Sequence, residues 1–215
     1  MEWIVIILYA LTLGIICLFS LAQFNLSWHY LKSKKVSEEA DVELKSYPLV
    51  TVQLPVYNEK YVVERLIEAV CKLDYPLDKL EIQVLDDSTD ETVGIIGAKV
   101  DHFREKGINI QHIRRPERVG FKAGALQYGM EIAHGEFLAI FDADFMPHPD
   151  FLIRTLSKFT GPQVGMIQTK WSHLNKDYSP LTKIQAFWLD AHFTVEQKGR
   201  SYAGSFINFN GTAGV

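Results

Sequence analysis

The stretch of residues 137–145 constrains the fold of this chain more than any other. Residues 137–141 (Phe-Leu-Ala-Ile-Phe) are all apolar, which is typical of a strand buried on both faces of a sheet. Two carboxylates, Asp142 and Asp144, follow at once. Alternation along a strand would place both carboxylates on the same side of the chain. The chain therefore has to build a sheet that is covered on both faces, with a pair of acids at the end of one strand.

This acidic pair has two interpretations. In an open α/β sheet, ligands bind at the carboxyl ends of the strands. Hard carboxylate oxygens at that end suit a divalent cation that also holds phosphates. The other interpretation is an Asp-rich turn whose carboxylates are merely solvated, and the Asp-x-Asp spacing by itself does not decide between the two.

The N-terminal segment predicts a helix that spans a membrane. No charged residue occurs from Trp3 to Trp28, and residues 3–22 are almost wholly apolar. Twenty helical residues rise about 30 Å, the thickness of a hydrocarbon core. A cleaved signal peptide fits less well, because the only charged side chain before the run is the acidic Glu2 and because the run exceeds the usual apolar core of a signal. A soluble core helix fits less well still.

Basic residues after the apolar run predict its orientation. Lys32, Lys34 and Lys35 follow directly, and the positive-inside rule places them, with the domain that follows, in the cytoplasm. We therefore expect three parts: a transmembrane anchor over residues 1–31, a polar cytoplasmic linker over residues 32–47 and a globular domain over residues 48–215.

From Pro48 onward, strands and helices alternate with short connections. Apolar runs predict strands over residues 49–54, 81–85, 109–114, 137–141 and 164–169. Helical spacing predicts helices over residues 62–70, 122–133 and 150–159, and a further one that reaches about residue 106. Pro55 is expected to end the first strand, and Ser88 and Glu91 have the spacing of a capping box. The alternation predicts an α/β fold with a mainly parallel sheet.

Polar clusters follow four of these strands, at the ends that parallel strands bring to one edge of the sheet. They are Val56-Tyr57-Asn58-Glu59, Asp86-Asp87, the basic stretch 114–122, and the pair Asp142 and Asp144. Each allows an ordinary role, because Asn58 could cap a helix, the acids could face a helix dipole and Lys122 could be a surface lysine. Together they favour a nucleotide site, in which a tyrosine and two acids hold a base and ribose while a lysine and a metal hold a pyrophosphate.

Composition and charge exclude several other classes. A net charge of −4 gives no general basic face, so no nucleic-acid partner is expected. The seven histidines are scattered without metal-ligand spacing. The two cysteines, Cys17 and Cys71, indicate neither a disulfide framework nor a zinc site.

Five segments resemble the motifs of a known family. In chain order they are Leu54-Pro-Val-Tyr-Asn-Glu59, Val84-Leu-Asp-Asp-Ser88, Gly120-Phe-Lys-Ala-Gly-Ala-Leu126, Phe141-Asp-Ala-Asp144 and Phe209-Asn-Gly-Thr-Ala-Gly214. As an ordered set they resemble family 2 glycosyltransferases, in particular the cellulose-synthase-like branch that makes β-mannan, glucomannan or β-glucan backbones. The resemblance implies a GT-A fold, a nucleotide-sugar-binding α/β domain with membrane helices on either side.

The resemblance also implies roles for individual residues. Tyr57, Asn58 and Glu59 match residues that contact the nucleoside of the donor. Asp86, with Asp87 beside it, matches the acid that contacts the base. Lys122 and Asp142 match residues at the donor phosphates. Asp142 and Asp144 match the metal motif, and the implied cofactor is Mg²⁺ or Mn²⁺. The implied acceptor-binding residues are Phe209, Asn210, Gly211 and Thr212, with Gln168 and Trp171 near the sugar pocket.

The implied activity is that of a membrane-bound, inverting hexosyltransferase of polysaccharide or cell-wall biosynthesis. It would transfer a hexose from GDP-mannose or UDP-glucose to a growing β-linked polysaccharide or other glycan. The sequence does not distinguish between the two donors. Its partners would be the nucleotide sugar, the glycan acceptor and a lipid membrane. That membrane would be a bacterial inner membrane or, in a eukaryote, the Golgi membrane, with the domain facing the cytoplasm.

Two motifs of the family have no counterpart in this sequence. The family places its general base in a Thr/Ser-Glu-Asp motif and follows it with Gln-x-x-Arg-Trp, both beyond the segment that Phe209–Gly214 matches. We therefore expect a C-terminally truncated piece of a longer protein, with no catalytic residue of its own and the base beyond Val215. Asp190 and Glu196 are the nearest carboxylates, and their helical run over residues 181–196 favours packing on the domain or lying at a membrane interface.

Other functions depend on particular residues. A Rossmann dehydrogenase needs Gly-x-Gly-x-x-Gly after its first strand, and residues 54–59 contain no glycine. An Asp-x-Asp phosphatase usually carries Thr or Ser soon after its second Asp, whereas Phe145-Met146-Pro147 follows here. A non-catalytic nucleotide-sugar sensor or scaffold stays open, because the base that would distinguish it is not in the sequence.

Overall fold

The structure is a computed structural model that describes residues 2–34, 44 and 46–215. The chain divides into two compact units. One unit combines Met1–Glu39 with Lys170–Asn208, and the other combines Ala40–Thr169 with Phe209–Val215. Much of the predicted linker, including Lys35, lies outside the described residues.

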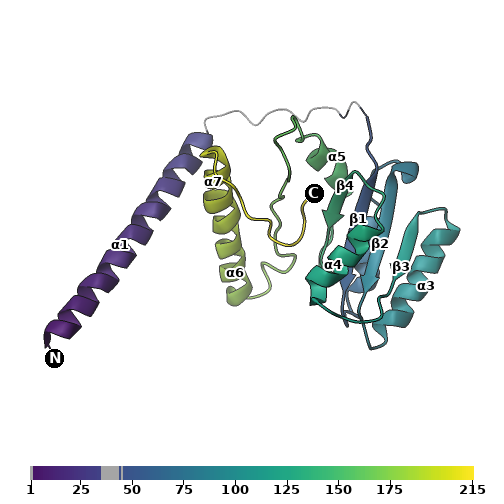
Figure 1. Cartoon of the computed structure of the whole chain (residues 1–215), viewed down its shortest axis with the longest axis horizontal. Helices are drawn as coiled ribbons and strands as arrows, with labels where there is room; N and C mark the ends of the chain where they lie inside the picture. Colours follow the sequence, from purple (N-terminus) through teal and green to yellow (C-terminus); the bar gives the residue numbers. More distant parts are fainter. Residues whose placement is uncertain (1, 35–43, 45) are drawn as a thin grey trace. The chain divides into compact units, whose positions relative to one another are not determined.

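The second unit contains a four-stranded sheet in which all neighbouring strands are parallel. Its strands lie in the order β3-β2-β1-β4 (Figure 1). Their bounds are β1 (Val50–Val56), β2 (Leu80–Asp86), β3 (Ile110–Ile113) and β4 (Phe137–Ile140). The prediction of an α/β fold with a mainly parallel sheet is confirmed.

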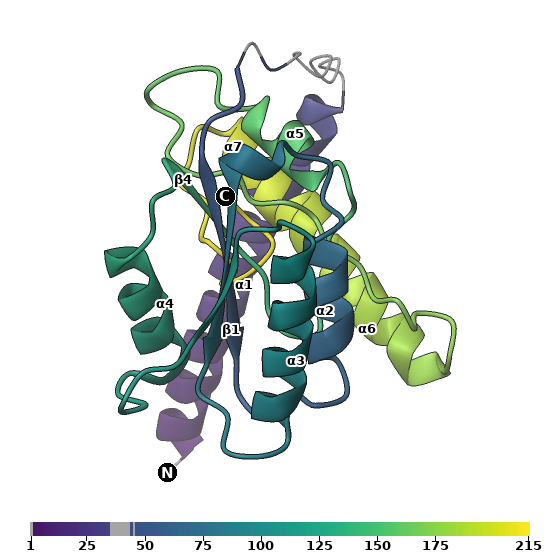
Figure 2. The same ribbon diagram turned by 90° about the vertical axis from the view of Figure 1, so that its right-hand side faces the viewer.

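Helices cover both faces of this sheet. They are α2 (Val63–Val70), α3 (Thr92–Glu105), α4 (Phe121–Glu131) and α5 (Phe151–Leu156), and a short 3-10 helix, η1 (Leu77–Lys79), precedes β2. α2 and α3 lie on one face and α4 on the other (Figure 2). Right-handed crossovers from β1 to β2 to β3 run in one direction, and the return from β3 to β4 runs in the other, so its helix lies on the opposite face. The enclosed core includes the fully buried Leu54, Ile82 and Val84.

The strand order creates a switch point between β1 and β4. The chain leaves β1 toward β2 on one side and returns to β4 on the other, and a crevice at such a point is where open α/β sheets bind ligands. Beyond β4, Gly214 forms antiparallel bridges to both Ile140 and Gln168. The predicted fifth strand over residues 164–169 is therefore wrong. Gly214 is the residue that bridges to the end of β4, and the segment 164–169 forms only an isolated bridge, from Gln168 to Gly214.

Pro55 lies inside β1 and does not end it, contrary to the prediction. The strand continues to Val56, and Pro55 pairs with Leu85 of β2. The Gln53 carbonyl accepts a hydrogen bond from the Phe141 N–H (3.2 Å), so Pro55, two residues further on, turns its nitrogen to the same side. The ladder with β4 has ended at that level. The missing N–H therefore removes no ladder hydrogen bond.

The predicted capping box of Ser88 and Glu91 is also wrong. α3 begins at Thr92, and its N-cap residue, Glu91, makes no side-chain capping hydrogen bond. The Ser88 hydroxyl instead accepts a hydrogen bond from the Asn58 N–H (2.9 Å), and Glu91 pairs with Lys60 at 3.1 Å. Both side chains join the loop after β2 to the loop after β1, a contact that local spacing does not reveal.

The other unit is built from helices. α1 (Glu2–Ser33) is the only helix among the described residues whose length and apolar composition would let it cross a membrane. Its large apolar side chains are exposed. α7 (Lys198–Tyr202) approaches α1 closely, since a Cβ on Gly199 would lie 2.7 Å from the Leu26 carbonyl oxygen.

The predicted helix over residues 181–196 changes its hydrogen-bond pattern part of the way along. Its regular part, α6 (Pro180–Ala191), begins with a capping box of Ser179 and Thr182. A π-helix, η2 (His192–Gln197), follows and leads into α7.

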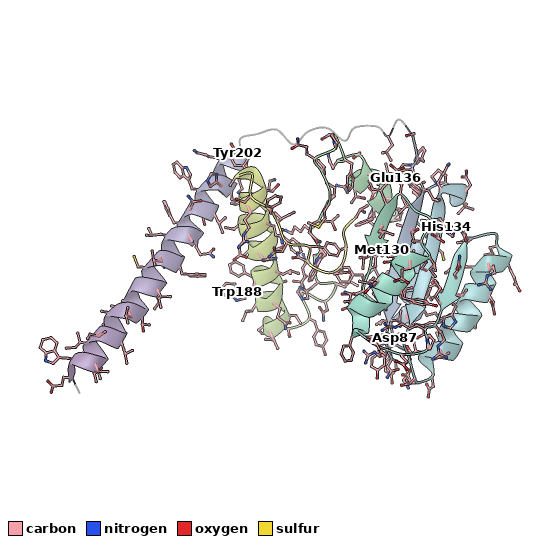
Figure 3. All side chains as sticks on the ribbon, in the orientation of Figure 1. Asp87, Met130, His134, Glu136, Trp188 and Tyr202 are labelled. Atoms are coloured by element: carbon pink, nitrogen blue, oxygen red, sulfur yellow. The ribbon has the colours of Figure 1, made fainter. Side chains whose placement is uncertain are left out.

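A buried carboxylate ties the amino ends of the strands together. Glu81, with a side chain 2% exposed, accepts hydrogen bonds from the Thr51 hydroxyl (2.5 Å) and the His134 N–H (2.9 Å), and lies 3.0 Å from His134 Nδ1. Burial opposes ionisation, but these hydrogen bonds outweigh it and hold the pKa of Glu81 below its ordinary value. Figure 3 places His134 at the end of the sheet opposite to Asp87.

Replacing Glu81 by alanine should destabilise the unit that contains the sheet. The substitution removes the acceptor of the Thr51 hydroxyl and the His134 N–H, and a buried donor left unsatisfied costs about 1–3 kcal/mol. Urea denaturation followed by circular dichroism should give a lower free energy of unfolding for Glu81→Ala. Glu131→Ala, at an exposed position of α4, is the control and should change this free energy by less than about 0.5 kcal/mol. Equal stability of the two variants would contradict the structural role of Glu81.

Candidate functional site

Lys122 and Asp142 meet beside the switch point of the sheet. Lys122 lies in the first turn of α4, and Asp142 follows shortly after β4. The Lys122 ammonium donates hydrogen bonds to a carboxylate oxygen of Asp142 and to the backbone carbonyl of Gly211 (2.8 Å). The two charged side chains remain partly exposed, at 41% and 35%. Residues predicted for the donor phosphates, the metal and the acceptor are thus in contact.

Residues 209–214 are held at the end of β4. The backbone N–H of Asp142 donates a hydrogen bond to the hydroxyl of the buried Thr212 (2.9 Å). Gly214 permits a close approach within the segment, because a Cβ there would lie 2.5 Å from the ring of Phe209. The predicted acceptor segment is therefore a fixed part of the site rather than a loose tail.

The two residues predicted near the sugar pocket lie in different surroundings. Gln168 donates from Nε2 to the Thr212 carbonyl (3.0 Å) and accepts at Oε1 from the Asn210 N–H (2.9 Å). Its amide is therefore committed to the backbone of the 209–214 segment, which it supports. Trp171 belongs to the other compact unit, where its ring packs edge-on against Phe193 at a centroid distance of 5.3 Å.

Asp144 lies in a turn rather than in the strand. β4 ends at Ile140, and the Phe145 N–H donates to the Asp142 carbonyl (3.0 Å), which closes a turn over residues 142–145. The strand alternation expected to align the two carboxylates therefore does not apply. Asp144 is exposed, and its carboxylate forms no hydrogen bond or ion pair with the described part of the chain.

Asp142 and Asp144 are of the ligand type used by a divalent cation whose other ligands come from a substrate and water. Within residues 2–34, 44 and 46–215, no group of three or more His, Cys, Asp or Glu side chains could hold a metal. Mg²⁺, however, is usually bound through one or two carboxylates together with substrate phosphates and waters, and Mn²⁺ prefers the same hard oxygens. Asp142 and Asp144 supply such a pair, and the exposed Asp144 is uncommitted among the described residues.

Asn58 joins the loops that follow β1 and β2. It adopts a left-handed conformation (φ 56°), which asparagine tolerates better than most residues. Its N–H donates to the Ser88 hydroxyl (2.9 Å), and its Oδ1 accepts from the Thr89 N–H (2.9 Å). Tyr57 and Glu59 on either side remain exposed. Asn58 therefore shapes the predicted nucleoside loop through these hydrogen bonds, and all three residues of the loop are exposed.

Asp86 is committed to internal partners. Its side chain is 0% exposed, with one oxygen 2.8 Å from His112 Nε2 and the other accepting the Ser88 N–H (2.8 Å). Burial opposes ionisation, but the hydrogen bonds from His112 and Ser88 outweigh it and lower the pKa of Asp86. The carboxylate predicted to contact the base is thus held ionised and faces the interior.

Asp87 and Arg115 form a buried, bidentate ion pair. Arg115 Nε and Nη2 donate to the two carboxylate oxygens of Asp87 at 2.7 and 2.6 Å, and both side chains are less than 10% exposed (8% and 7%). The guanidinium also donates to the backbone carbonyls of Val119 (2.6 Å) and Phe121 (2.8 Å). Arg115 therefore holds the loop that leads into α4 and so places Lys122.

Gly124 allows this loop to lie against the first turn of α4. A Cβ at Gly124 would lie 2.0 Å from the Val119 carbonyl oxygen and 2.6 Å from Arg115 Nη1. Both neighbours belong to the loop that Arg115 holds. Only glycine fits between the helix and the loop.

Three residues of the site were assigned no role from the sequence. His112 binds Asp86, Arg115 binds Asp87, and Arg118 lies over an aromatic ring of the loop after β1. For Arg115 and Arg118 the available signal is the density of basic residues between positions 114 and 122. It marks the end of the third strand but does not show which acid or ring each side chain meets.

Comparison with known proteins identifies relatives of the chain. The family model described as Glycosyl transferase family 2 matches residues 51–215. Probable glucomannan 4-beta-mannosyltransferase 7 of Oryza sativa subsp. japonica is 46% identical over 174 residues, which are 79% of this chain and 30% of that protein. Glucomannan 4-beta-mannosyltransferase 2 of Arabidopsis thaliana is 42% identical over 189 residues, 86% of this chain and 35% of that protein. The chain thus spans about a third of the length of these relatives.

A solved structure shares the architecture. It is the mannosyltransferase PcManGT from Pyrobaculum calidifontis, in complex with GDP-Man and Mn²⁺. It is 29% identical to this chain with a TM-score of 0.61, and the match covers 77% of this chain and 48% of that one. The fold around the switch point is therefore one that also occurs in a nucleotide-sugar complex.

Gly124→Ala should displace the loop that Arg115 holds and lower stability. The new methyl group cannot lie 2.0 Å from a backbone oxygen, and overpacking of this kind costs about 1–3 kcal/mol. Gly94→Ala is the matched control, because nothing lies within 4 Å of a Cβ at that position of α3. Alanine there should raise stability by about 0.5–1 kcal/mol. Thermal denaturation measures the melting temperature of each variant. A shift of both melting temperatures in the same direction would contradict the close approach at Gly124.

Proposed function

The chain belongs to glycosyl transferase family 2, and from that membership we propose that it is the donor-binding part of a membrane-bound mannosyltransferase. The curated relatives are named as glucomannan 4-beta-mannosyltransferases, and the solved relative is described with GDP-Man. These names favour GDP-mannose over UDP-glucose as the donor. The acceptor we propose is a growing β-linked glycan.

The observation that carries the proposal is the contact of Lys122 with Asp142 beside the uncommitted Asp144. A nucleoside diphosphate needs positive charge at its phosphates, and a lysine ammonium is a compact donor for phosphate oxygens. Lys122 neutralises Asp142 here, in a pair whose two side chains are both partly exposed. We propose that, when the donor binds, the Lys122 ammonium pairs with its diphosphate and the Asp142 carboxylate binds a cation.

The cofactor we propose is Mg²⁺ or Mn²⁺, held by Asp142 and Asp144. When bound, the cation would neutralise charge on the diphosphate and so make it a better leaving group. The solved relative is described with Mn²⁺. Lys122 would add a hydrogen bond to a phosphate oxygen and stabilise the charge that builds up on the departing diphosphate.

The reaction we propose is a single displacement with inversion. The acceptor hydroxyl attacks the anomeric carbon, the bond from that carbon to the diphosphate breaks, and a base takes the hydroxyl proton. We assign the base to no described residue. Asp190 accepts a hydrogen bond from Lys170 (2.7 Å), which lowers the pKa of Asp190, and Glu196 lies 2.9 Å from His192 Nδ1. The lowered pKa makes Asp190 a weaker base.

Lys122→Ala should weaken the binding of GDP more than the binding of guanosine. Loss of a hydrogen bond to a charged group costs about 1.5–3 kcal/mol, or roughly ten- to a hundredfold in the Kd for GDP. Calorimetry on the full chain in detergent measures both ligands. Lys79→Ala, at the amino end of β2, is the control and should leave both affinities unchanged. Equal losses for GDP and guanosine would remove Lys122 from the phosphate site.

Asp144→Ala should reduce the dependence of GDP binding on the cation. The wild-type chain should bind GDP more tightly with Mn²⁺ than with a chelator present, and this ratio should fall about tenfold or more in the variant. Asp78→Ala, an exposed carboxylate in η1, should keep the wild-type ratio. An unchanged ratio in Asp144→Ala would remove Asp144 from the metal site.

A further inference from the structure

The ring of Tyr57 is covered on one face by a cation of the protein itself. The central carbon of the Arg118 guanidinium lies 3.4 Å from the centre of the Tyr57 ring. This is well within the distance of about 6 Å from a ring centre at which a guanidinium is attracted to an aromatic face. Nothing else can stack on that face while Arg118 is there, although Tyr57 as a whole is 40% exposed.

A second aromatic ring meets the same guanidinium. The Arg118 carbon lies 4.9 Å from the centre of the Phe121 ring, and Phe121 is 65% exposed. Phe121 also has a positive φ of 49°, which is rare and costly for a bulky residue. Its carbonyl accepts a hydrogen bond from Arg115 (2.8 Å), which helps to hold this conformation. The first residue of α4 is thus an exposed aromatic residue in a strained backbone conformation.

The backbone around Arg118 is fixed, but its side chain is held weakly. Arg115 binds the Val119 and Phe121 carbonyls just after Arg118 in the sequence. The Arg118 side chain itself is 36% exposed, and its charged contact is with Asp87 at 3.8 Å, beyond hydrogen-bond distance. Asp87 already has a bidentate partner in Arg115. The guanidinium can therefore leave the rings by a rotamer change, without movement of the loop.

We propose that Arg118 occupies the position of the donor's nucleobase on Tyr57 and must be displaced when the donor binds. A guanidinium is planar and stacks on aromatic faces as a nucleobase does. This inference rests on the proposed function, because it takes Tyr57 as the ring that stacks on the base. Arg118 then acts as an internal competitor: it covers one face of the Tyr57 ring and lowers the affinity for the base.

The test compares the binding of an uncharged nucleoside by the wild-type chain and by Arg118→Ala. Guanosine and uridine carry no phosphate, so the loss of a positive charge does not disguise the result. A cation–π contact at an exposed site contributes about 0.5–1 kcal/mol, so Arg118→Ala should bind the nucleosides roughly two- to fivefold more tightly. Saturation-transfer NMR or calorimetry on the full chain in detergent can measure this change.

Two further variants separate competition at the ring from a general effect. Arg65→Ala, at an exposed position of α2, removes an arginine elsewhere and should leave nucleoside affinity unchanged. In a Tyr57→Ala background, Arg118→Ala should no longer tighten binding, because the shared ring is gone. Unchanged or weaker nucleoside binding by Arg118→Ala, or equal tightening with and without Tyr57, would overturn the inference. If the wild-type chain bound no nucleotide at all, the proposed function would fail, and this inference with it.

Discussion

The geometry of the site depends on the ion pair between Asp87 and Arg115. It joins the end of β2 to the loop after β3, and it is buried and bidentate. The same guanidinium binds two carbonyls of the loop that enters α4. A guanidinium has five donors in a rigid fork, so one side chain can hold an acid and a backbone loop together. Lysine could not replace it, because a single ammonium lacks that planar geometry.

A fixed backbone is combined here with side-chain contacts that can be exchanged. Asp86, Asp87 and Arg115 are buried, and removing one partner of a buried charge pair is costly. Lys122 with Asp142 and Arg118 with Tyr57 are partly exposed, and contacts of this kind contribute only about 0–1 kcal/mol. Such contacts keep the charges paired and cover one face of the Tyr57 ring, and in our proposals a phosphate, a cation and a nucleobase replace them on binding.

Much of the architecture could be predicted from the sequence. The spacing of apolar residues along the chain shows which side of each strand or helix is buried, and the order of strands and helices indicates a parallel sheet. The predictions that failed concern residues whose partners lie far along the chain. Ser88 meets Asn58 instead of capping a helix, Pro55 stays in β1 because no ladder partner is lost, and the predicted fifth strand is displaced by Gly214. Residue type and local spacing do not specify such partners.

By itself the sequence determined the parallel α/β fold, the apolar helix α1 and the edge of the sheet where polar residues gather. These follow from patterns of hydrophobicity, which act over a few neighbouring residues. Only the tertiary structure decided that Lys122 reaches Asp142, that Asp144 lies in a turn, that Gln168 supports the backbone and that Arg118 covers Tyr57. The physical reason is that hydrogen bonds and charge pairs act over a few ångströms in space, and folding sets those distances independently of separation along the chain.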